Sequence, residues 1–351
     1  MEAGESAEAG GSGRLDGGTQ APDDRFGRRQ RDTRRGVRAL LRRHGSELYA
    51  EAPTRNSCTS LVRIYSAQVL GLSVTSWTLD PLQLAPIGVL AVAYGARART
   101  LARGGRPVPG WRIGLFTLGL VLLVVALASP VHAAGEELFS AHMAQHLLLG
   151  DLAPLCLLAG LNGPLLQPLL AVLPVQRLSH LANPLVALPL WTLNLVVWHL
   201  PALYEGAVRH DALHALEHVS FLSAGLIMWL PVLETLPAPE WFGTGAKLGY
   251  IVCVRLVDTI VGNVFVWAGA AVYGVYVGGE ELFGLSPEAD QSLAGALMML
   301  EGSLVTIVAI AWLFLRLAEE GDARQRLLER GLDARAVRRA VRYGRWRELE
   351  G

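Results

Sequence analysis

The distribution of apolar residues predicts a bundle of helices that cross a membrane. Seven apolar runs lie between residues 82 and 317, and each is close to or above the ~20 residues that span a bilayer. The runs cover residues 82–98, 113–131, 142–161, 184–204, 214–236, 248–277 and 293–317. A proline-containing connector, residues 165–181, separates the third run from the fourth. The predicted fold class is all-α: a polytopic membrane protein with about seven transmembrane helices in one bundle.

The composition agrees with this prediction. Hydrophobic residues make up 52% of the chain and charged residues 18%, and the mean hydropathy of +0.34 is too high for an ordinary soluble domain. Cys58, Cys156 and Cys253 form no CxxC pair, so neither a disulfide framework nor a thiol-redox centre is indicated. The sequence has no glycine-rich phosphate loop, nucleophile elbow or CxxCH motif. We therefore expect neither catalysis nor a nucleic-acid partner, and the lipid bilayer is the first partner.

Patterning divides the chain into three parts. Residues 1–76 form a basic arm without apolar periodicity, which we interpret as disordered or as an over-long translation start. Residues 77–317 form the membrane domain. Residues 318–351 form a basic tail.

The arginines predict which side of the membrane each loop occupies. Five arginines lie in residues 97–112 and many more follow residue 315, whereas residues 132–141 and 278–291 contain neither lysine nor arginine. Basic loops remain in the cytoplasm. With seven spans, the 97–112 loop and the C-terminal tail are both predicted to be cytoplasmic, in a multi-pass protein of the plasma membrane.

This topology gathers most of the histidines at the outer face. Seven of the nine histidines fall there, and only His44 and His180 do not. Those at steps of four share one face of a helix. The candidate ligands are His142 and His146 on one helix, His214 and His218 on another, and His132, His199 and His210 near the ends of runs.

Two methionines and the absence of competing oxygen ligands point to the metal. Met143 lies beside the first histidine pair, and Met298 lies in the outer part of the last run. Imidazole suits several transition metals, and thioether suits Cu(I). A site rich in histidine, on the oxidising side of a membrane, favours copper, and specifically Cu(I).

Each of these features also has a simpler explanation. The histidines could be interfacial groups hydrogen-bonded to loop carbonyls, and the methionines could be packing residues. Glu217 is either a carboxylate that orients an imidazole or a solvated group. Four charged residues at intermediate depth form either a structural ion network or an ion path, with Arg255 and Asp258 spaced to pair. They are Asp151, Arg255, Asp258 and Glu301.

Several motifs together resemble the cytochrome c oxidase assembly factor family of the CtaG type, over roughly residues 77–317. The matching residues are His142-Met143-x2-His146, Gly160-x2-Gly163-Pro164, His199-x-Pro201-x2-Tyr204, His214-x2-Glu217-His218, Trp229-x-Pro231 and Asp290-Gln291-x2-Ala294-Gly295-x2-Met298. Met299 stands where the family often has tryptophan, so the local chemistry of the last span departs from the pattern.

The resemblance implies a function and a set of partners. It implies seven spans and a role in assembling haem–copper oxidases by handling copper for the binuclear centre. The partners implied are subunits of cytochrome c oxidase and an external copper donor. Two other classes stay open: a membrane redox enzyme with haem b between His146 and His218, and a copper transporter whose path is lined by the buried charges.

Overall fold

The computed structural model describes residues 77–78, 80–172, 179–278, 283–342 and 344–350. All of these residues lie in one compact unit of the chain. The predicted N-terminal arm, residues 1–76, lies outside the described residues.

The described residues form helices and no strands, which confirms the all-α prediction. The α-helices are α3 (Pro81–Arg103), α4 (Gly110–Ala128), α5 (Pro130–Gly135), α6 (Phe139–Leu147), α7 (Ala153–Gly160), α8 (Gly163–Val172), α10 (Pro184–Trp198), α11 (Pro201–Arg209), α12 (Asp211–Leu233), α13 (Thr244–Trp267), α14 (Pro287–Glu329), α15 (Ala334–Arg342) and α16 (Trp346–Glu350). A π-helical turn, η1 (Leu148–Leu152), joins α6 to α7, and a short 3-10 helix, η2 (Gly274–Tyr276), follows α13.

Four helices begin with the same local signal. A polar residue precedes a proline, and its side chain accepts a hydrogen bond from a backbone N–H of the first turn. Proline at this position loses no intrahelical hydrogen bond. The four pairs are Asp80-Pro81, Ser129-Pro130, Asn183-Pro184 and Ser286-Pro287. Helix α12 begins at Asp211, three residues before the predicted run, and His210 lies just outside it.

The predicted count of seven spans is not confirmed. Among the described residues, five helical segments are long and apolar enough to cross a membrane: α4, α6 to α7, α12, α13 and α14. Helices α10 and α11 make a sixth if they form one span, but they are bent by 71° at a break. The break follows from Pro201, since the residue before a proline avoids helical backbone. Helix α3 has 23 residues but is not among these spans.

Two predicted runs end at different residues in the structure. Helix α13 stops at Trp267, where the predicted run continued to residue 277, because the following segment passes through Gly269 at a positive φ of 67°. Helix α14 continues without a break to Glu329, although the apolar run ends at residue 317. Hydropathy marks where lipid contact ends, whereas charged residues can continue a helix into water.

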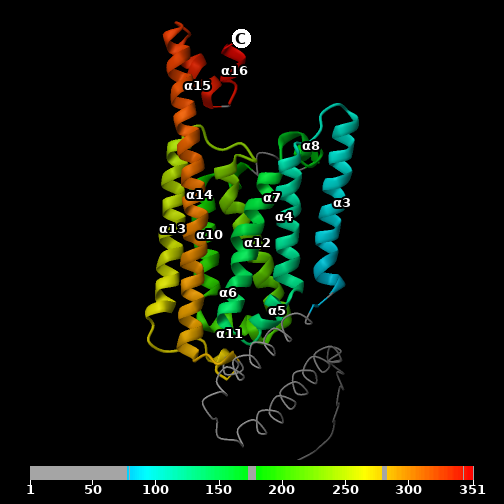
Figure 1. Cartoon of the computed structure of the whole chain (residues 1–351), viewed down its shortest axis with the longest axis vertical. Helices are drawn as coiled ribbons and strands as arrows, with labels where there is room; N and C mark the ends of the chain where they lie inside the picture. Colours follow the sequence, from blue (N-terminus) through cyan, green and yellow to red (C-terminus); the bar gives the residue numbers. More distant parts are fainter. Residues whose placement is uncertain (1–76, 79, 173–178, 279–282, 343, 351) are drawn as a thin grey trace, which may run out of the picture. The chain divides into compact units, whose positions relative to one another are not determined.

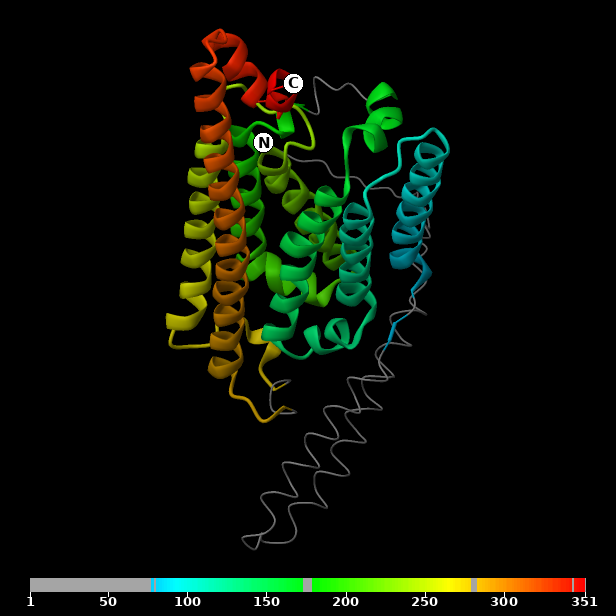
Figure 2. The same ribbon diagram turned by 45° about the horizontal axis from the view of Figure 1, so that its top comes forward.

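The helices pack into one bundle with two distinct ends (Figure 1). Helix α13 lies along α14, α4 along α7, and α10 along α12, while α6 also contacts α14. The histidine end carries α5, α11 and the first turns of α6 and α12. The tail end carries the α3–α4 loop, α8, α15 and α16. The 97–112 loop and the C-terminal tail therefore lie at the same end, as predicted, and Figure 2 gives a second view of this arrangement.

One glutamate ties the tail helices to the bundle. Glu234, just after α12, has left-handed backbone (φ 53°). Its carboxylate lies 3.0 Å from Lys247 Nζ, 3.0 Å from Arg316 Nη2 and 3.2 Å from Arg342 Nη1. Burial alone raises the pKa of Glu234, but Lys247 and Arg316 outweigh it and hold the pKa below its usual value. Part of the predicted tail is thus anchored to the bundle.

Small residues allow close helix contact at the centre of the bundle. Gly225 of α12 meets the backbone of Gly150 in the π-helical turn, and a Cβ there would overlap the Gly150 carbonyl. Gly295 of α14 meets Gly262 of α13 in the same way. Membrane helices use small residues in this manner because lipid supplies no hydrophobic drive between them.

Substituting Gly225→Ala should therefore destabilise the protein. Forcing a methyl group into a packed contact costs roughly 1–3 kcal/mol, and α12 can relieve the overlap only by moving away from α6 and α7. We expect a lower midpoint in thermal unfolding of the detergent-solubilised protein. Gly249→Ala is the matched control, because a Cβ at Gly249 meets open space. Equal midpoints for the two variants would contradict the packing argument.

Candidate metal centre

The first histidine pair is placed by a cap from another helix. Helix α6 begins without a cap from its own N-terminal residue. Instead Asp290 of α14 accepts hydrogen bonds from the backbone N–H of Phe139 (2.7 Å) and Ser140 (3.1 Å), and from the Ser140 hydroxyl. A carboxylate at a helix N-terminus satisfies donors that the helix cannot. This contact fixes where α6 starts, and therefore where its histidines point.

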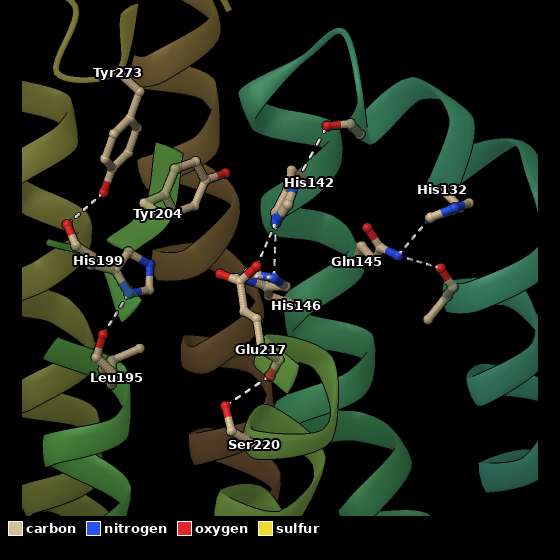
Figure 3. Close-up of polar contacts among 12 residues, drawn as sticks. His132, His142, Gln145, His146, Leu195, His199, Tyr204, Glu217, Ser220 and Tyr273 are labelled. Carbon is tan, nitrogen blue, oxygen red and sulfur yellow. Dashed lines mark hydrogen bonds and ion pairs between the residues drawn. The ribbon is translucent and has the colours of Figure 1, made fainter. Parts of the chain in front are cut away.

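His142 and His146 face each other along α6 (Figure 3). Their Nε2 atoms are 2.9 Å apart, and both side chains are buried. Two nitrogens that bind one ion at ~2.0–2.1 Å lie about 3 Å apart. The pair is therefore spaced for a shared metal ion. Without an ion, one of the two nitrogens must donate a hydrogen bond to the other.

Helix α12 brings the second set of ligands to this pair. Two groups of residues could hold an ion. The first is His142, His146 and His218, and the second is His142, His214 and Glu217. Within each group the ligand atoms lie within 4.8 Å of one another. The ring centroids of His214 and His218 are 4.2 Å apart, and that of His214 is 5.2 Å from that of His142. Four imidazoles from two helices thus gather around His142.

Glu217 is the one carboxyl group among the residues of this cluster. Its side chain is fully buried, and its carboxylate oxygens lie 3.8 Å from His142 Nε2 and 3.7 Å from His146 Nε2. Neither oxygen has a hydrogen-bond partner among the described residues. No described lysine or arginine pairs with it. A buried carboxylate without compensation is costly, so the site is suited to a cation.

Hydrogen bonds from Nδ1 to backbone carbonyls orient two of the imidazole rings. His142 Nδ1 lies 3.4 Å from the Gly135 carbonyl, and His199 Nδ1 lies 2.7 Å from the Leu195 carbonyl. A carbonyl can only accept, so each Nδ1 carries the proton and each Nε2 is left with its lone pair, as in many metal sites. Buried Nε2 atoms of His199, His214 and His218 have no hydrogen-bond partner among the described residues.

His132 reaches the cluster from α5. Gln145 Nε2 donates to His132 Nδ1 at 3.1 Å and to the Ala126 carbonyl at 2.8 Å (Figure 3). The His132 ring centroid is 6.0 Å from that of His214. Burial lowers the pKa of His132, and Glu136 offsets this only in part, so the imidazole is neutral at physiological pH.

The remaining predicted ligands lie in three different settings. His199 stands at the bend between α10 and α11, half-buried, and is not among the groups whose ligand atoms converge. His210 is exposed and belongs to neither of these groups. Met143 and Met298 are buried together in an apolar cluster with aromatic residues. They lie beside the histidines, where they pack.

Aromatic side chains close the cluster on one side. Tyr204 of α11 and Tyr276 share a hydrogen bond of 2.8 Å, and both rings lie near His142. The Tyr273 hydroxyl donates to the His199 carbonyl at 2.7 Å. Burial raises the pKa of Tyr273 and Tyr276, so both remain neutral donors.

A cavity leads from the histidines into the bundle. It is lined by His146 and His199 and, deeper, by the four charged residues predicted at intermediate depth: Asp151, Arg255, Asp258 and Glu301. The predicted pairing is confirmed, since Arg255 Nη1 lies 2.6 Å from Asp258 Oδ2. Trp229 Nε1 donates to Asp151 Oδ1 at 2.7 Å.

Comparison with known proteins identifies the family. The profile of the cytochrome c oxidase caa3 assembly factor family, Caa3_CtaG, matches residues 92–320, which include every helix of the histidine cluster. The chain belongs to the Caa3_CtaG family. The resemblance inferred from the motifs is thus confirmed.

The similar curated proteins come from mycobacteria. The chain is 26% identical over 267 residues to uncharacterized proteins of Mycobacterium bovis and Mycobacterium tuberculosis, and 26% identical over 265 residues to one of Mycobacterium leprae. Each match covers 70% of this chain but 40% of the relative, so the chain spans less than half the length of these proteins. No solved structure matches it.

Some residues that build the candidate metal centre were not assigned a role from the sequence. Gln145 connects two helices, and Gln291 accepts from Val272 N–H (2.7 Å) and donates to the carbonyls of Phe265 and Ala270. Asp290 and Gln291 were identified only as parts of a motif. The sequence did indicate a structural role for Gln145, because an amide side chain inside an apolar run needs hydrogen-bond partners within the bundle. Which partners it takes depends on helices distant in the sequence.

Proposed function

We propose that this chain binds Cu(I) at the histidine cluster and passes it to a cytochrome c oxidase during assembly, without catalysing a reaction. Its family is described as an assembly factor of the caa3-type oxidase, which supports an oxidase as recipient. The observation that supports the metal part is the buried Glu217 carboxyl group beside ring nitrogens of His146, His214 and His218 that have no hydrogen-bond partner among the described residues.

Charge favours a monovalent ion. One Cu(I) beside one ionised Glu217 and neutral imidazoles gives a centre with no net charge. A divalent ion would leave one positive charge in an apolar setting, which carries a desolvation cost. Imidazole is a good ligand for copper, and the neighbouring thioethers of Met143 and Met298 suit Cu(I). Binding through His142, His146 and His218 is therefore the proposed mode, with Glu217 as counter-charge.

The ring arrangement does not favour haem as the ligand. A haem between His146 and His218 needs space for a planar macrocycle between the two rings. The centroid of His142 is 4.3 Å from that of His146 and 6.4 Å from that of His218. The His142 ring thus lies beside the space between His146 and His218 that the macrocycle would need. Absorption spectra and metal analysis of the purified protein separate the two ligands: haem gives a Soret band, whereas Cu(I) is colourless.

The proposed orientation places the histidine end outside the plasma membrane, where an external donor supplies copper. The test uses single cysteines in a background without Cys58, Cys156 and Cys253. Ala289→Cys lies at an exposed position of the histidine end and Ala334→Cys at one of the tail end. An impermeant thiol reagent on intact cells should label the first and not the second. Labelling of only the second would reverse the orientation.

The delivery role predicts an oxidase defect that copper relieves. A deletion strain should make oxidase subunits but show low oxidase activity at limiting copper, and added copper should restore part of it by mass action. His146→Ala should copy the deletion. The measurement is oxidase activity in membranes across a copper titration. Normal activity in the deletion strain at limiting copper would refute the assembly role.

A further inference from the structure

A groove of about 710 Å³ opens on the side of the bundle, in the half nearer the tail end. Helices α4 and α14 form its two walls, and α7 and α12, which lie between them in Figure 1, form its base. Wall residues are exposed, among them Trp111 (59%), Val308 (69%) and Trp312 (42%), whereas Leu158 and Trp229 at the base are buried. The groove is therefore open to the surroundings of the bundle. In a bilayer, a recess that protein does not fill is filled by lipid.

The length of the groove fits one leaflet of a bilayer. Along α14 its lining runs from Leu304 to Trp312, which is about 12 Å at a rise of ~1.5 Å per residue. The hydrocarbon core of a bilayer is ~30 Å thick, so the groove covers less than half of it. A helix of a partner protein crosses the whole core, whereas a lipid molecule stays within its own leaflet. The dimensions therefore favour a lipid over a transmembrane helix as the occupant.

The polar residues of the groove lie together at the tail end. They are Arg112 in the first turn of α4, Asn162 just after α7, and Glu234 and Thr235 just after α12. The other lining residues are leucine, valine, alanine, glycine, cysteine and tryptophan. A molecule with a polar head at the tail end and an apolar chain along α14 matches this distribution.

One guanidinium group is held at the polar end of the groove. Arg112 Nη1 donates to the carbonyls of Ala159 (2.9 Å) and Leu161, and the guanidinium carbon lies 4.4 Å from the centroid of the Trp111 ring. These partners fix its position but carry no negative charge. No ion pair joins Arg112 to a carboxylate of the described residues. Its positive charge is therefore available to a ligand.

The carboxylate at the same end does not compete for this charge. Glu234 lies within 3.0 Å of Lys247 and Arg316 and within 3.2 Å of Arg342, so its negative charge is already offset. The uncompensated charge that lines the groove is that of Arg112. A guanidinium group donates several hydrogen bonds to the oxygens of a phosphate. The charge at this end thus complements an anionic phosphate head.

We propose that the groove binds one phospholipid of the tail-side leaflet, with an anionic headgroup at Arg112 and an acyl chain between α4 and α14. A lipid in this position contacts both walls and the base, and so stabilises the arrangement of these helices. The site shares no residue with the histidine cluster, and it is independent of the copper-binding proposal.

The test adds lipid to the protein in a nonionic detergent, after its own lipid has been removed. Phosphatidylglycerol and phosphatidylcholine with identical acyl chains are compared by native mass spectrometry and by thermal unfolding. The anionic lipid should bind about tenfold more tightly, equivalent to ~1.4 kcal/mol. It should also raise the unfolding midpoint, because it binds the native state. Equal affinities of the two lipids would overturn the anionic headgroup.

Two neighbouring positions on α14 test whether the groove is the site. Val308→Trp places a large side chain in the groove and should lower the binding of both lipids. Ile307→Trp is the matched control, since Ile307 is 64% exposed but does not line the groove. An equal loss in the two variants would mean that lipid binds elsewhere. A wild-type dimer that Val308→Trp dissociates would assign the groove to a second copy of the chain and overturn the lipid.

Substitutions of Arg112 test the headgroup. Arg112→Gln should abolish the preference for phosphatidylglycerol, whereas Arg112→Lys, which keeps the charge, should retain it. Arg99→Gln, at an exposed position near the same end that does not line the groove, is the control and should leave the preference unchanged. Because the preference is a ratio of two affinities, a general loss of stability does not imitate this result. A preference that survives in Arg112→Gln would overturn the role of the guanidinium group.

Discussion

Replacing both His146 and His218 with alanine should abolish Cu(I) binding. The two residues supply ligands from α6 and α12, so the double substitution leaves His142 without either partner in its group. Loss of a group that only supports a ligand already costs about 10–100-fold in metal affinity, and loss of two ligands should exceed this. The measurement is competition with a coloured Cu(I) chelator in detergent. Lower pH should weaken wild-type binding, because protonated imidazole cannot bind metal.

The matched control for this substitution is His210→Ala. His210 lies at the same end of the bundle but is exposed and lies outside the converging groups. The affinity of the His210→Ala variant for Cu(I) should equal that of the wild-type protein. Unchanged binding in the double variant would refute the assignment of the ligands. A loss of equal size in His210→Ala would mean that the cluster is not the site.

Replacing Glu217 with glutamine should lower Cu(I) affinity by about 10–100-fold while leaving the metal-free protein at least as stable. Glutamine keeps the shape and removes the charge, so the bound ion loses the counter-charge that neutralises it. In the metal-free protein the substitution removes a fully buried carboxyl group that has no described hydrogen-bond partner. No stabilising contact is lost, so the free energy of unfolding should not fall. The opposite signs of the two effects distinguish a counter-charge from a structural glutamate.

The measurements are Cu(I) competition and thermal unfolding with and without copper. Glu240→Gln, at an exposed position near the tail end, is the control and should change neither quantity. Equal Cu(I) affinity for Glu217→Gln and wild-type protein would remove the charge argument for a monovalent ion. A large fall in the stability of the metal-free Glu217→Gln variant would assign the glutamate a packing role instead.

The sequence by itself determined most of what depends on neighbours in the chain. Apolar runs predicted the helices, and Pro201 ended one of them for a local reason. The four-residue spacing of His142 and His146 placed their rings on one face of α6, and the structure sets their Nε2 atoms 2.9 Å apart. The i to i+3 spacing of Arg255 and Asp258 likewise predicted their ion pair.

Only the tertiary structure decided which helices meet at the site and which residues hold them. His218 joins His142 and His146 because α12 packs against α7 and the π-helical turn, at a contact that Gly225 permits. Asp290 and Gln145 position the histidines from sequence separations of 150 and 13 residues. Helical periodicity fixes the direction of a side chain relative to its own axis, but the distance between two helices depends on side-chain volumes and polar partners from the whole bundle. His210 lies outside the cluster for a local reason, because it precedes the first turn of α12 in extended backbone. The packing of α12, in contrast, buries the Glu217 carboxyl group among the histidines.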